Sequence, residues 1–438
     1  MKRILNPRFS LVLLLLLATL SLVSQTGDKI DKSYKWTYDL ETEGTLELEN
    51  YDCDIIIHTW DKEKAELQLY VLADLKNDED AKIMDQHIKD LEFDHSPSSV
   101  SFKTKFWESR KQIITKKTIR LKKGLSMPYT QLKVKAELWL PKSASLKLKS
   151  KYSRINMEEI YGKLMLDLYN DNLKGESAGG NMGIVAKYAT IEFYDCKDVK
   201  ANLYDSNFTS GETGNCDYTS KYSKVTSTKA LTLNIDSYND KYLFETCGNI
   251  DMVSKYTDLT TKEAGKVKID SYEGSYTINS CQNIEIVNSK YTNFVNETAK
   301  DLHIESIYEG SISSSHINSL SIKESKYVVY KLGALNKSLS LEVGYEDDFF
   351  IDALGSDFSG IDLNGKYIKC ETVIPDDLNF KIKADIKYPH LDLEKAELTT
   401  RIKIQESSQL EFEAYKGEDL STLPLISLSG YEMTFRVK

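Results

Sequence analysis

Carboxylates are the residues of this sequence that are best placed for chemistry. Glu346, Asp347 and Asp348 form the densest acidic group, and Asp352 and Asp357 follow them closely. Two carboxylates that flank a sugar linkage can act as acid and base in glycoside cleavage, and carboxylate oxygens also bind calcium. The group lacks the spacing of a calcium-binding loop, so the simpler interpretation is a solvated acidic turn. We predict no metal site and no cofactor.

Histidines and basic residues give weaker signals. The six histidines are scattered, and none has the sequence context of a catalytic triad or a metal site. We therefore expect surface or strand histidines. The basic segment from Arg110 to Lys123 has two interpretations. It could contact anionic glycans or lipid headgroups, or it could form a solvated hairpin, which is the simpler expectation.

The composition limits the class of protein. The chain has 438 residues, and its hydrophobic fraction of 41% is ordinary for a globular protein. Its 57 Lys and Arg residues against 67 Asp and Glu residues give a net charge of −10, which argues against a nucleic-acid partner. The 27 tyrosines far outnumber the 14 phenylalanines and 4 tryptophans. This excess indicates a recurring position that requires tyrosine.

Two interleaved tyrosine series run through the middle of the chain. A Lys-Tyr pair recurs every 34 to 40 residues, and a second tyrosine that is followed by an acid lies between successive pairs. The Lys-Tyr series comprises Tyr152, Tyr188, Tyr222, Tyr256, Tyr291, Tyr327 and Tyr367. The Tyr-acid series comprises Tyr169, Tyr204, Tyr238, Tyr272, Tyr308 and Tyr345. Such regular spacing is the signature of a structural repeat.

The segments around these tyrosines have the composition and period of β-strands. Apolar residues alternate before the tyrosines, as in 164–168, 231–235 and 339–343. An apolar residue also follows three positions after each Lys-Tyr tyrosine and four positions after each tyrosine of the second series. Alternation over such short runs predicts half-buried strands, and no segment of the repeat has the 3.6-residue period of a helix.

A repeat of 17 to 18 residues cannot bury its own apolar face, so it must stack on its neighbours. We predict an all-β fold, a single-stack β-solenoid of roughly 13 short coils. With coils about 4.8 Å apart, the stack is on the order of 60 Å long. A β-propeller, which needs about 40 residues for each blade, is the lesser alternative.

Stacking gives the charges and rings of the repeat a structural role. Coils with the lysine alternate with coils that carry the acid, so we expect attraction between neighbouring coils. Recurrence on alternate coils favours a structural ladder over a single active site. The tyrosines are expected to stack along one edge, and the sequence leaves open whether their rings point in or out.

The two ends of the chain differ from the repeat. We predict a mixed strand and helix cap over residues 25–145, the solenoid over 146–370 and a β-strand cap over 371–438. Within the first cap, residues 77–91 predict a helix, because acids fill its first turn and apolar residues form a stripe. Atypical ends suit a solenoid, whose terminal coils would otherwise expose open strand edges.

Residues 1–24 predict a secretory signal peptide. Basic residues precede an apolar run from Leu11 to Leu22, and small and polar residues follow it. The run is short for a spanning helix, so an uncleaved anchor is the lesser alternative. No later segment is long and apolar enough to span a bilayer. We expect an exported protein, in the periplasm, on the outer surface or secreted.

The six cysteines do not predict a complete disulfide framework. Cys247 and Cys281 hold equivalent positions two coils apart, near 10 Å by strand spacing, which is beyond the reach of a disulfide. Cys196 and Cys216 fall on neighbouring coils and could bond. The simpler expectation is that the cysteines are small buried residues.

Two segments resemble a known family. Residues 44–61 read GTLELENYDCDIIIHTWD and residues 138–149 read LWLPKSASLKLK. They are similar to the opening strand pair and the strand-Pro-strand entry of the bacterial putative-adhesin β-solenoid family (DUF4097/DUF2807-like). That family usually turns on Asn-Gly, whereas the turns here read Lys-Tyr-Ser or Tyr-Asn-Asp. The resemblance implies the solenoid fold and an adhesin-like role, and it transfers no catalytic residue.

The leading functional hypothesis is a non-enzymatic, adhesin-like binding or scaffold protein of the cell envelope. Its partner would be a surface glycan or another envelope protein. The candidate binding surface is the ladder formed by the tyrosines of both series from Tyr152 to Tyr345, which are twelve residues. One alternative is a carbohydrate-active enzyme, a lyase or hydrolase, built on a β-helix. Another is a partner in envelope-stress signalling, which predicts a discrete patch on a cap.

Overall fold

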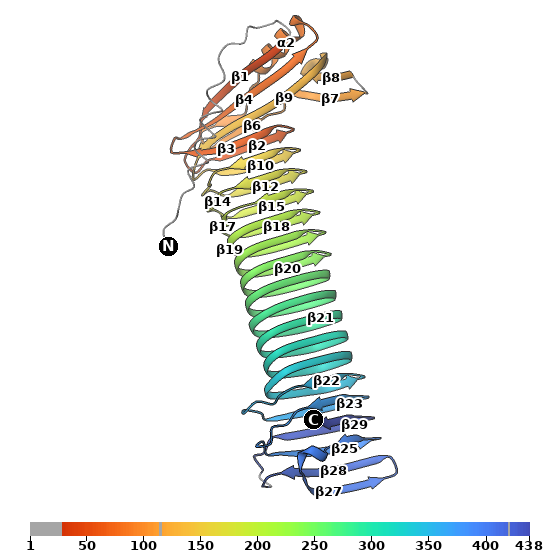
Figure 1. Ribbon diagram of the computed structural model, residues 1–438. Helices are drawn as coiled ribbons and strands as arrows, with labels where there is room; N and C mark the ends of the chain where they lie inside the picture. Colours follow the sequence, from red (N-terminus) through yellow and green to blue (C-terminus); the bar gives the residue numbers. More distant parts are fainter. Residues whose placement is uncertain (1–28, 114–115, 419–420) are drawn as a thin grey trace.

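The protein is an all-β solenoid with an extension at each end (Figure 1). The computed structural model describes residues 29–113, 116–418 and 421–438, and the predicted signal peptide lies outside these residues. The fold class predicted from the sequence is confirmed. In the part of the chain that the structure describes, no helix combines the length and the apolar character needed to cross a membrane.

Each coil contributes strands that pair in parallel with the strands of the next coil, and from β10 to β20 the register does not shift. The early coils consist of β10 (Ser145–Lys151), β11 (Arg154–Met157), β12 (Leu164–Tyr169), β13 (Asn172–Gly175), β14 (Ser177–Ala178), β15 (Met182–Lys187), β16 (Thr190–Glu192), β17 (Asp195–Cys196) and β18 (Val199–Tyr204). The later coils consist of β19 (Asn207–Lys221), β20 (Lys224–Tyr238), the continuous ribbon β21 (Lys241–Tyr345), β22 (Asp348–Ile351), β23 (Gly360–Lys366) and β24 (Lys369–Thr372). Backbone hydrogen bonds therefore run along the whole stack.

The core is a single column of inward-facing side chains inside the coils. The apolar residues that follow the two tyrosine series are all at most 3% exposed. They are Ile155, Leu173, Ile191, Phe208, Val225, Tyr242, Leu259, Tyr276, Phe294, Ile312, Tyr330, Phe349 and Cys370. The predicted strand alternation is thus confirmed, because every second side chain enters the column.

Two residues of the predicted alternation face solvent instead. Leu231 is 56% exposed, because Ala230 and Leu233 take the inward positions on either side of it. Val343 is 58% exposed, and the pairing of β21 with β23 shifts between Leu341 and Gly344. An extra residue in a strand reverses the alternation beyond it, and the sequence pattern does not reveal such a shift.

A residue in the left-handed conformation closes one corner of every coil. Thirteen such corners lie between Tyr152 and Tyr367, with φ between 47° and 62°. Tyrosine occupies every second corner, and Asn, Asp or Glu occupies the corners between: Tyr152, Asn170, Tyr188, Asp205, Tyr222, Asn239, Tyr256, Glu273, Tyr291, Glu309, Tyr327, Glu346 and Tyr367. The roughly 13 coils predicted for this part of the chain match these corners.

Polar side chains inside the column satisfy the backbone just after several corners. The Ser206 N–H donates to Ser223 Oγ of the following coil at 3.2 Å, and the Ser223 N–H donates to Asp240 Oδ1 at 2.6 Å. Asp171 and Asp347 accept the N–H of the preceding coil in the same way, at 2.8 and 2.9 Å. A buried N–H without such a partner would cost about 1–3 kcal/mol.

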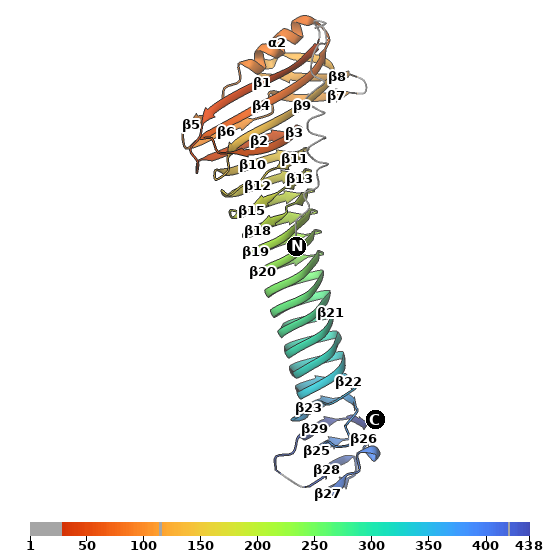
Figure 2. The same ribbon diagram turned by 60° about the vertical axis from the view of Figure 1, so that its left-hand side comes forward.

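The N-terminal extension is inserted between two stacked coils. Parallel pairing extends beyond the predicted repeat, because β2 (Thr45–Tyr51) and β3 (Asp54–Trp60) stack on β10 and β11. The chain then leaves through β4 (Lys64–Leu75), α2 (Asp78–Lys89), β5 (His95–Ser96), β6 (Ser99–Lys103), β7 (Trp107–Ile113), β8 (Lys116–Leu121), the 3₁₀ turn η1 (Lys122–Gly124) and β9 (Ser126–Pro141). β1 (Lys29–Asp39), β4 and β9 form an antiparallel sheet that continues from β3 (Figure 2).

The helix α2 confirms the helix predicted from the sequence. The Asn77 side chain accepts the Asp80 N–H at 2.8 Å and caps the N-terminus, where three acids follow. Ala81, Met84 and Ile88 are buried. The helix packs on β1 and β4, where Tyr34 Oη donates to Asp85 at 2.6 Å.

At the other end, the last strands return into the stack. The chain runs through β25 (Phe380–Lys387), β26 (His390–Asp392), the 3₁₀ turn η2 (Glu394–Ala396), β27 (Thr399–Glu406) and β28 (Gln409–Lys416). It then places β29 (Leu425–Tyr431) between β23 and β25, and β30 (Thr434–Val437) between β24 and β26. Lys438, Lys369 and Arg436 surround Glu371, and hydrogen bonds from Lys438 and Lys369 lower the pKa of Glu371 to about 2.

All six cysteines are free thiols, so the disulfide that the sequence allowed between Cys196 and Cys216 is not formed. Five of the six are buried and Cys281 is partly buried. Burial raises the pKa of Cys247 and Cys370 to about 12, which keeps these thiols protonated and unreactive at neutral pH. The expectation of small buried residues is confirmed for the five.

The buried carboxylates predict a specific dependence of stability on pH. Burial raises the pKa of Asp171 and Asp347 from 3.8 to about 6. Between pH 4 and 6 the folded chain therefore holds protons that the unfolded chain has lost, so stability falls as pH rises through this window, by on the order of 3 kcal/mol for each carboxyl. The double variant Asp171→Asn/Asp347→Asn is expected to flatten this slope in chemical unfolding at a series of pH values. The exposed Asp362→Asn serves as control, and an unchanged slope in the double variant would contradict the assignment.

Candidate functional site: the tyrosine ladder

A continuous tyrosine ladder runs along the corner edge of the whole stack. Each ring packs edge to face on the next, with centroids 5.4–6.1 Å apart and interplanar angles of 74–88°. In spatial order its members are Tyr51, Tyr152, Tyr169, Tyr188, Tyr204, Tyr222, Tyr238, Tyr256, Tyr272, Tyr291, Tyr308, Tyr327, Tyr345, Tyr367, Tyr431 and Tyr388. All twelve candidate binding tyrosines lie in it.

The rings lie outside the core, which settles the orientation that the sequence left open. Tyr152 and Tyr222 in the corner positions are 46% and 48% exposed, and Tyr204 in the strand position is 38% exposed. Partial burial and neighbouring phenols raise the pKa of Tyr256, so its hydroxyl stays protonated at neutral pH. The ladder therefore presents ring edges and hydroxyl groups to solvent.

Three members of the ladder lie outside the repeat found in the sequence. Tyr51, Tyr388 and Tyr431 join it because the first coil and the inserted last strands stack in register. A signal for them exists, since Tyr51-Asp52 and Tyr431-Glu432 are Tyr-acid pairs and Lys387-Tyr388 is a Lys-Tyr pair. Only their spacing along the chain is irregular.

Five of the seven lysines of the Lys-Tyr pairs contact tyrosine rings, rather than the acids expected from the sequence. Lys187 aligns with Tyr204 and Tyr169 of the adjacent coils, because lysine and strand tyrosine share one row. Its Nζ lies 5.0 Å from the Tyr204 ring and 5.1 Å from the Tyr188 ring. Among the described residues, no ion pair joins a lysine of the Lys-Tyr pairs to an acid of the Tyr-acid series. The expected attraction between charges on neighbouring coils is thus replaced by cation–π contacts.

The acids that follow the tyrosines occupy two different positions. Glu273 and Glu346 sit in the left-handed corner and face solvent, whereas Asp171 and Asp240 lie one residue further and turn into the column. Asp240 accepts hydrogen bonds from Ser220 Oγ, Ser237 Oγ and two backbone N–H groups. An acid that follows a tyrosine therefore lies either on the surface or in the core.

The dense acidic group is divided in the same way, which corrects its interpretation as a solvated turn. Asp347 is fully buried and accepts from Ser325 Oγ and Val328 N, while Glu346 faces solvent and Asp348 points outward from β22. Over residues 29–113, 116–418 and 421–438, no cluster of three or more His, Cys, Asp or Glu side chains is arranged to hold a metal ion.

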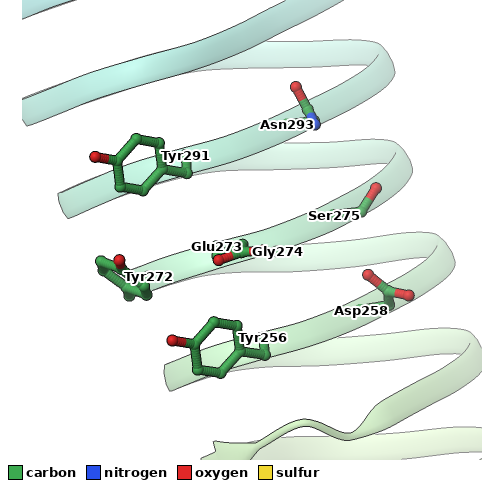
Figure 3. Close-up of a pocket in the computed structure, with 8 residues that line it drawn as sticks. All are labelled: Tyr256, Asp258, Tyr272, Glu273, Gly274, Ser275, Tyr291 and Asn293. Atoms are coloured by element: carbon green, nitrogen blue, oxygen red, sulfur yellow. The ribbon is translucent and has the colours of Figure 1, made fainter.

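Shallow hollows open beside the ladder where the chain turns into the next strand. One, of about 720 Å³, is lined by Tyr256, Tyr272 and Tyr291 on one side and by Asp258, Ser275 and Asn293 on the other (Figure 3). A second, of about 500 Å³, lies beside Tyr152 and Tyr188. The same surface groove thus recurs along the stack, with hydroxyl, amide and charged groups on its walls.

The basic segment and His58 lie at the N-terminal end of the stack. β7 and β8 form the expected hairpin, within which Arg120 pairs with Glu108 at 3.3 Å. Arg110 of β7 pairs with Asp52, outside the hairpin, at 2.7 Å. His58 lies on β3 and bonds Glu158 at 2.9 Å through Nδ1. The His58 ring also stacks on Trp139.

Comparison with known proteins identifies no family. No family model matches the chain, and no curated protein matches it. Among solved structures, a putative cell adhesion protein from Clostridium sporogenes is 8% identical, with 93% of this chain and 99% of that chain covered at a TM-score of 0.16. A putative adhesin from Bacteroides fragilis is 12% identical, with 69% and 97% covered at a TM-score of 0.19.

Paired substitutions in the ladder separate ring packing from backbone strain. Tyr222 is in the left-handed conformation and Tyr238 ends the strand β20, and each ring contacts two neighbours. Replacing either with asparagine loses two contacts worth about 0.5–1.5 kcal/mol each, but asparagine tolerates the left-handed corner. Tyr222→Asn is therefore expected to lower the unfolding free energy by about 1 kcal/mol less than Tyr238→Asn in denaturant titration. A larger loss for Tyr222→Asn would contradict this.

Proposed function

We propose that this chain is an exported, non-enzymatic β-solenoid with an adhesin-like binding or scaffold role, and that the tyrosine ladder is its binding surface. The observation that carries the proposal is the uninterrupted row of half-exposed rings along the stack, from Tyr51 to Tyr388. A surface that repeats with every coil suits a ligand that is itself extended and repetitive. The recurring hollows beside the corner tyrosines add polar walls to this surface.

A surface glycan is the partner class that this chemistry favours. The exposed ring edges offer apolar area to the C–H groups of sugars, while phenol hydroxyls donate and accept hydrogen bonds. Asn293 and Ser275 in the hollow offer further polar groups at the spacing of neighbouring coils. An envelope protein remains the second partner class, and it would use the same row of rings.

The binding test uses the chain from residue 25 to 438 on a glycan array, together with an assay for polysaccharide degradation. The triple variant Tyr222→Phe/Tyr238→Phe/Tyr256→Phe keeps every ring contact and removes only hydroxyl groups, so it is expected to fold and to lose roughly tenfold or more in glycan affinity, since each hydrogen bond contributes about 1 kcal/mol.

A buried tyrosine supplies the matched control. Tyr218 lies in the column, and within the described part of the chain its hydroxyl has no hydrogen-bond partner. Tyr218→Phe is therefore expected to leave binding unchanged and to preserve or raise stability. Unchanged binding in the triple variant would overturn the ladder as the site. Release of oligosaccharide by the wild-type chain would overturn the non-enzymatic role and favour a carbohydrate-active enzyme.

A further inference from the structure

The charges on the ladder face are divided unevenly along the stack. We define the ladder face by three rows of side chains: the strand-end row of alternating Lys and Tyr, the corner row, and the first outward row of the next strand. Over five coils from 187 to 258, which we call the lysine segment, these rows carry five lysines and two carboxylates. They are Lys187, Lys221, Lys224, Lys241 and Lys255, with Asp205 and Asp258.

The next five coils have the opposite balance. From 272 to 348, which we call the acidic segment, the same three rows carry Lys290 and Lys326 with Glu273, Glu309, Glu346 and Asp348. The outward row on the preceding strand adds Asp236 to the lysine segment, and Asp270 and Glu324 to the acidic segment. With this fourth row included, lysines still outnumber carboxylates in the lysine segment, and carboxylates still outnumber lysines in the acidic segment. The lysine segment is therefore positive although the whole chain carries a net charge of −10.

The corner row explains part of this difference. In the lysine segment one of the two corners without tyrosine is Asn239, whereas all three such corners of the acidic segment hold glutamate. Asparagine adopts the left-handed conformation readily and carries no charge. The alternation of tyrosine with a polar corner residue is thus kept while the negative charge is omitted.

The lysines of the lysine segment are available to a ligand. All five are exposed, and in the described part of the chain none of the five forms an ion pair. Lys187 and Lys221 lie over tyrosine rings at 5.0 and 5.7 Å, which holds each ammonium group beside a ring. A ligand carboxylate can therefore reach these cations without first displacing a protein carboxylate.

The spacing of the lysines suits a disaccharide repeat. Lys187, Lys221 and Lys255 occupy every second coil, so they recur about every 9.6 Å, twice the strand spacing. An extended glycan with alternating sugar orientation presents the same face once for every two sugars. Tyr204 and Tyr238 lie between successive lysines in this row, where the intervening sugar would sit.

We propose that the lysine segment binds a linear polysaccharide that carries one carboxylate per disaccharide. The lysines contact the carboxylates, and the tyrosine edges and hydroxyls contact the sugar between them. The acidic segment repels the same polymer, so binding is confined to part of the ladder. This inference rests on the proposed glycan-binding function and specifies its ligand class.

The test measures affinity for hyaluronan oligosaccharides, which carry one carboxylate per disaccharide, and for their uncharged methyl esters. The expected result is salt-sensitive binding of hyaluronan and binding of the ester that is weaker by roughly tenfold or more. Lys187→Gln/Lys221→Gln/Lys255→Gln is expected to lose a similar factor. The matched control Lys290→Gln/Lys326→Gln/Lys366→Gln replaces three equivalent lysines outside the segment and is expected to change affinity less than twofold.

The other outcomes are distinguishable. Equal binding of hyaluronan and its ester, or equal losses in the two triple variants, would overturn this inference and leave glycan binding by the ladder standing. Equal binding of poly-glutamate would overturn the assignment to a polysaccharide. Failure to bind any glycan would overturn both this inference and the proposed function. Because all the replaced lysines except Lys326 are exposed, unfolding midpoints are expected to stay close to wild type, and this checks that each variant is folded.

Discussion

The left-handed corner is the constraint on which the other features of the solenoid depend. A chain that turns there needs a residue with φ near 55°, and Asn or Asp accepts this readily while tyrosine does so at a cost of about 1–2 kcal/mol. Each tyrosine ring recovers this cost through two edge-to-face contacts of about 0.5–1.5 kcal/mol each. The ladder contacts therefore stabilise the corners that hold tyrosine.

The inside of the corner completes the same arrangement. Ser, Thr or Asp after the corner accepts a backbone N–H from the coil before it, as Ser223 does for Ser206 and Asp240 does for Ser223. At these corners a coil satisfies a backbone N–H of the preceding coil, and a row of buried polar side chains follows this edge of the column. On the surface, the tyrosine ladder stays the same from coil to coil while the charged side chains beside it vary. Binding properties can therefore change along the stack without disturbing the fold.

The sequence predicts the coils well, because each coil carries one ladder tyrosine and the spacing of the tyrosines therefore equals the length of a coil. It could not predict that Lys187 would meet Tyr204 rather than an acid, because the alignment depends on which residue takes the left-handed corner. Asp171 and Asp205 both follow a tyrosine, yet one residue of offset sends the first inward and the second outward. The repeat found in the sequence does not include Tyr431, because β29 is inserted between β23 and β25 and Tyr431 therefore enters the stack out of chain order.

Deleting coils from the middle of the stack tests the central claim most directly, that the alternating ladder and its corners set the stacking. Removing residues 222–255 takes out two coils and joins Lys221 to Tyr256, which keeps the alternation of lysine and tyrosine. Removing residues 222–238 takes out one coil together with the rings of Tyr222 and Tyr238. Lys221 then aligns with Lys255, and a coil without a ladder tyrosine separates Tyr204 from Tyr256. Denaturant midpoints are predicted to stay near wild type for the first deletion and to fall sharply for the second. Equal midpoints for the two deletions would contradict the account.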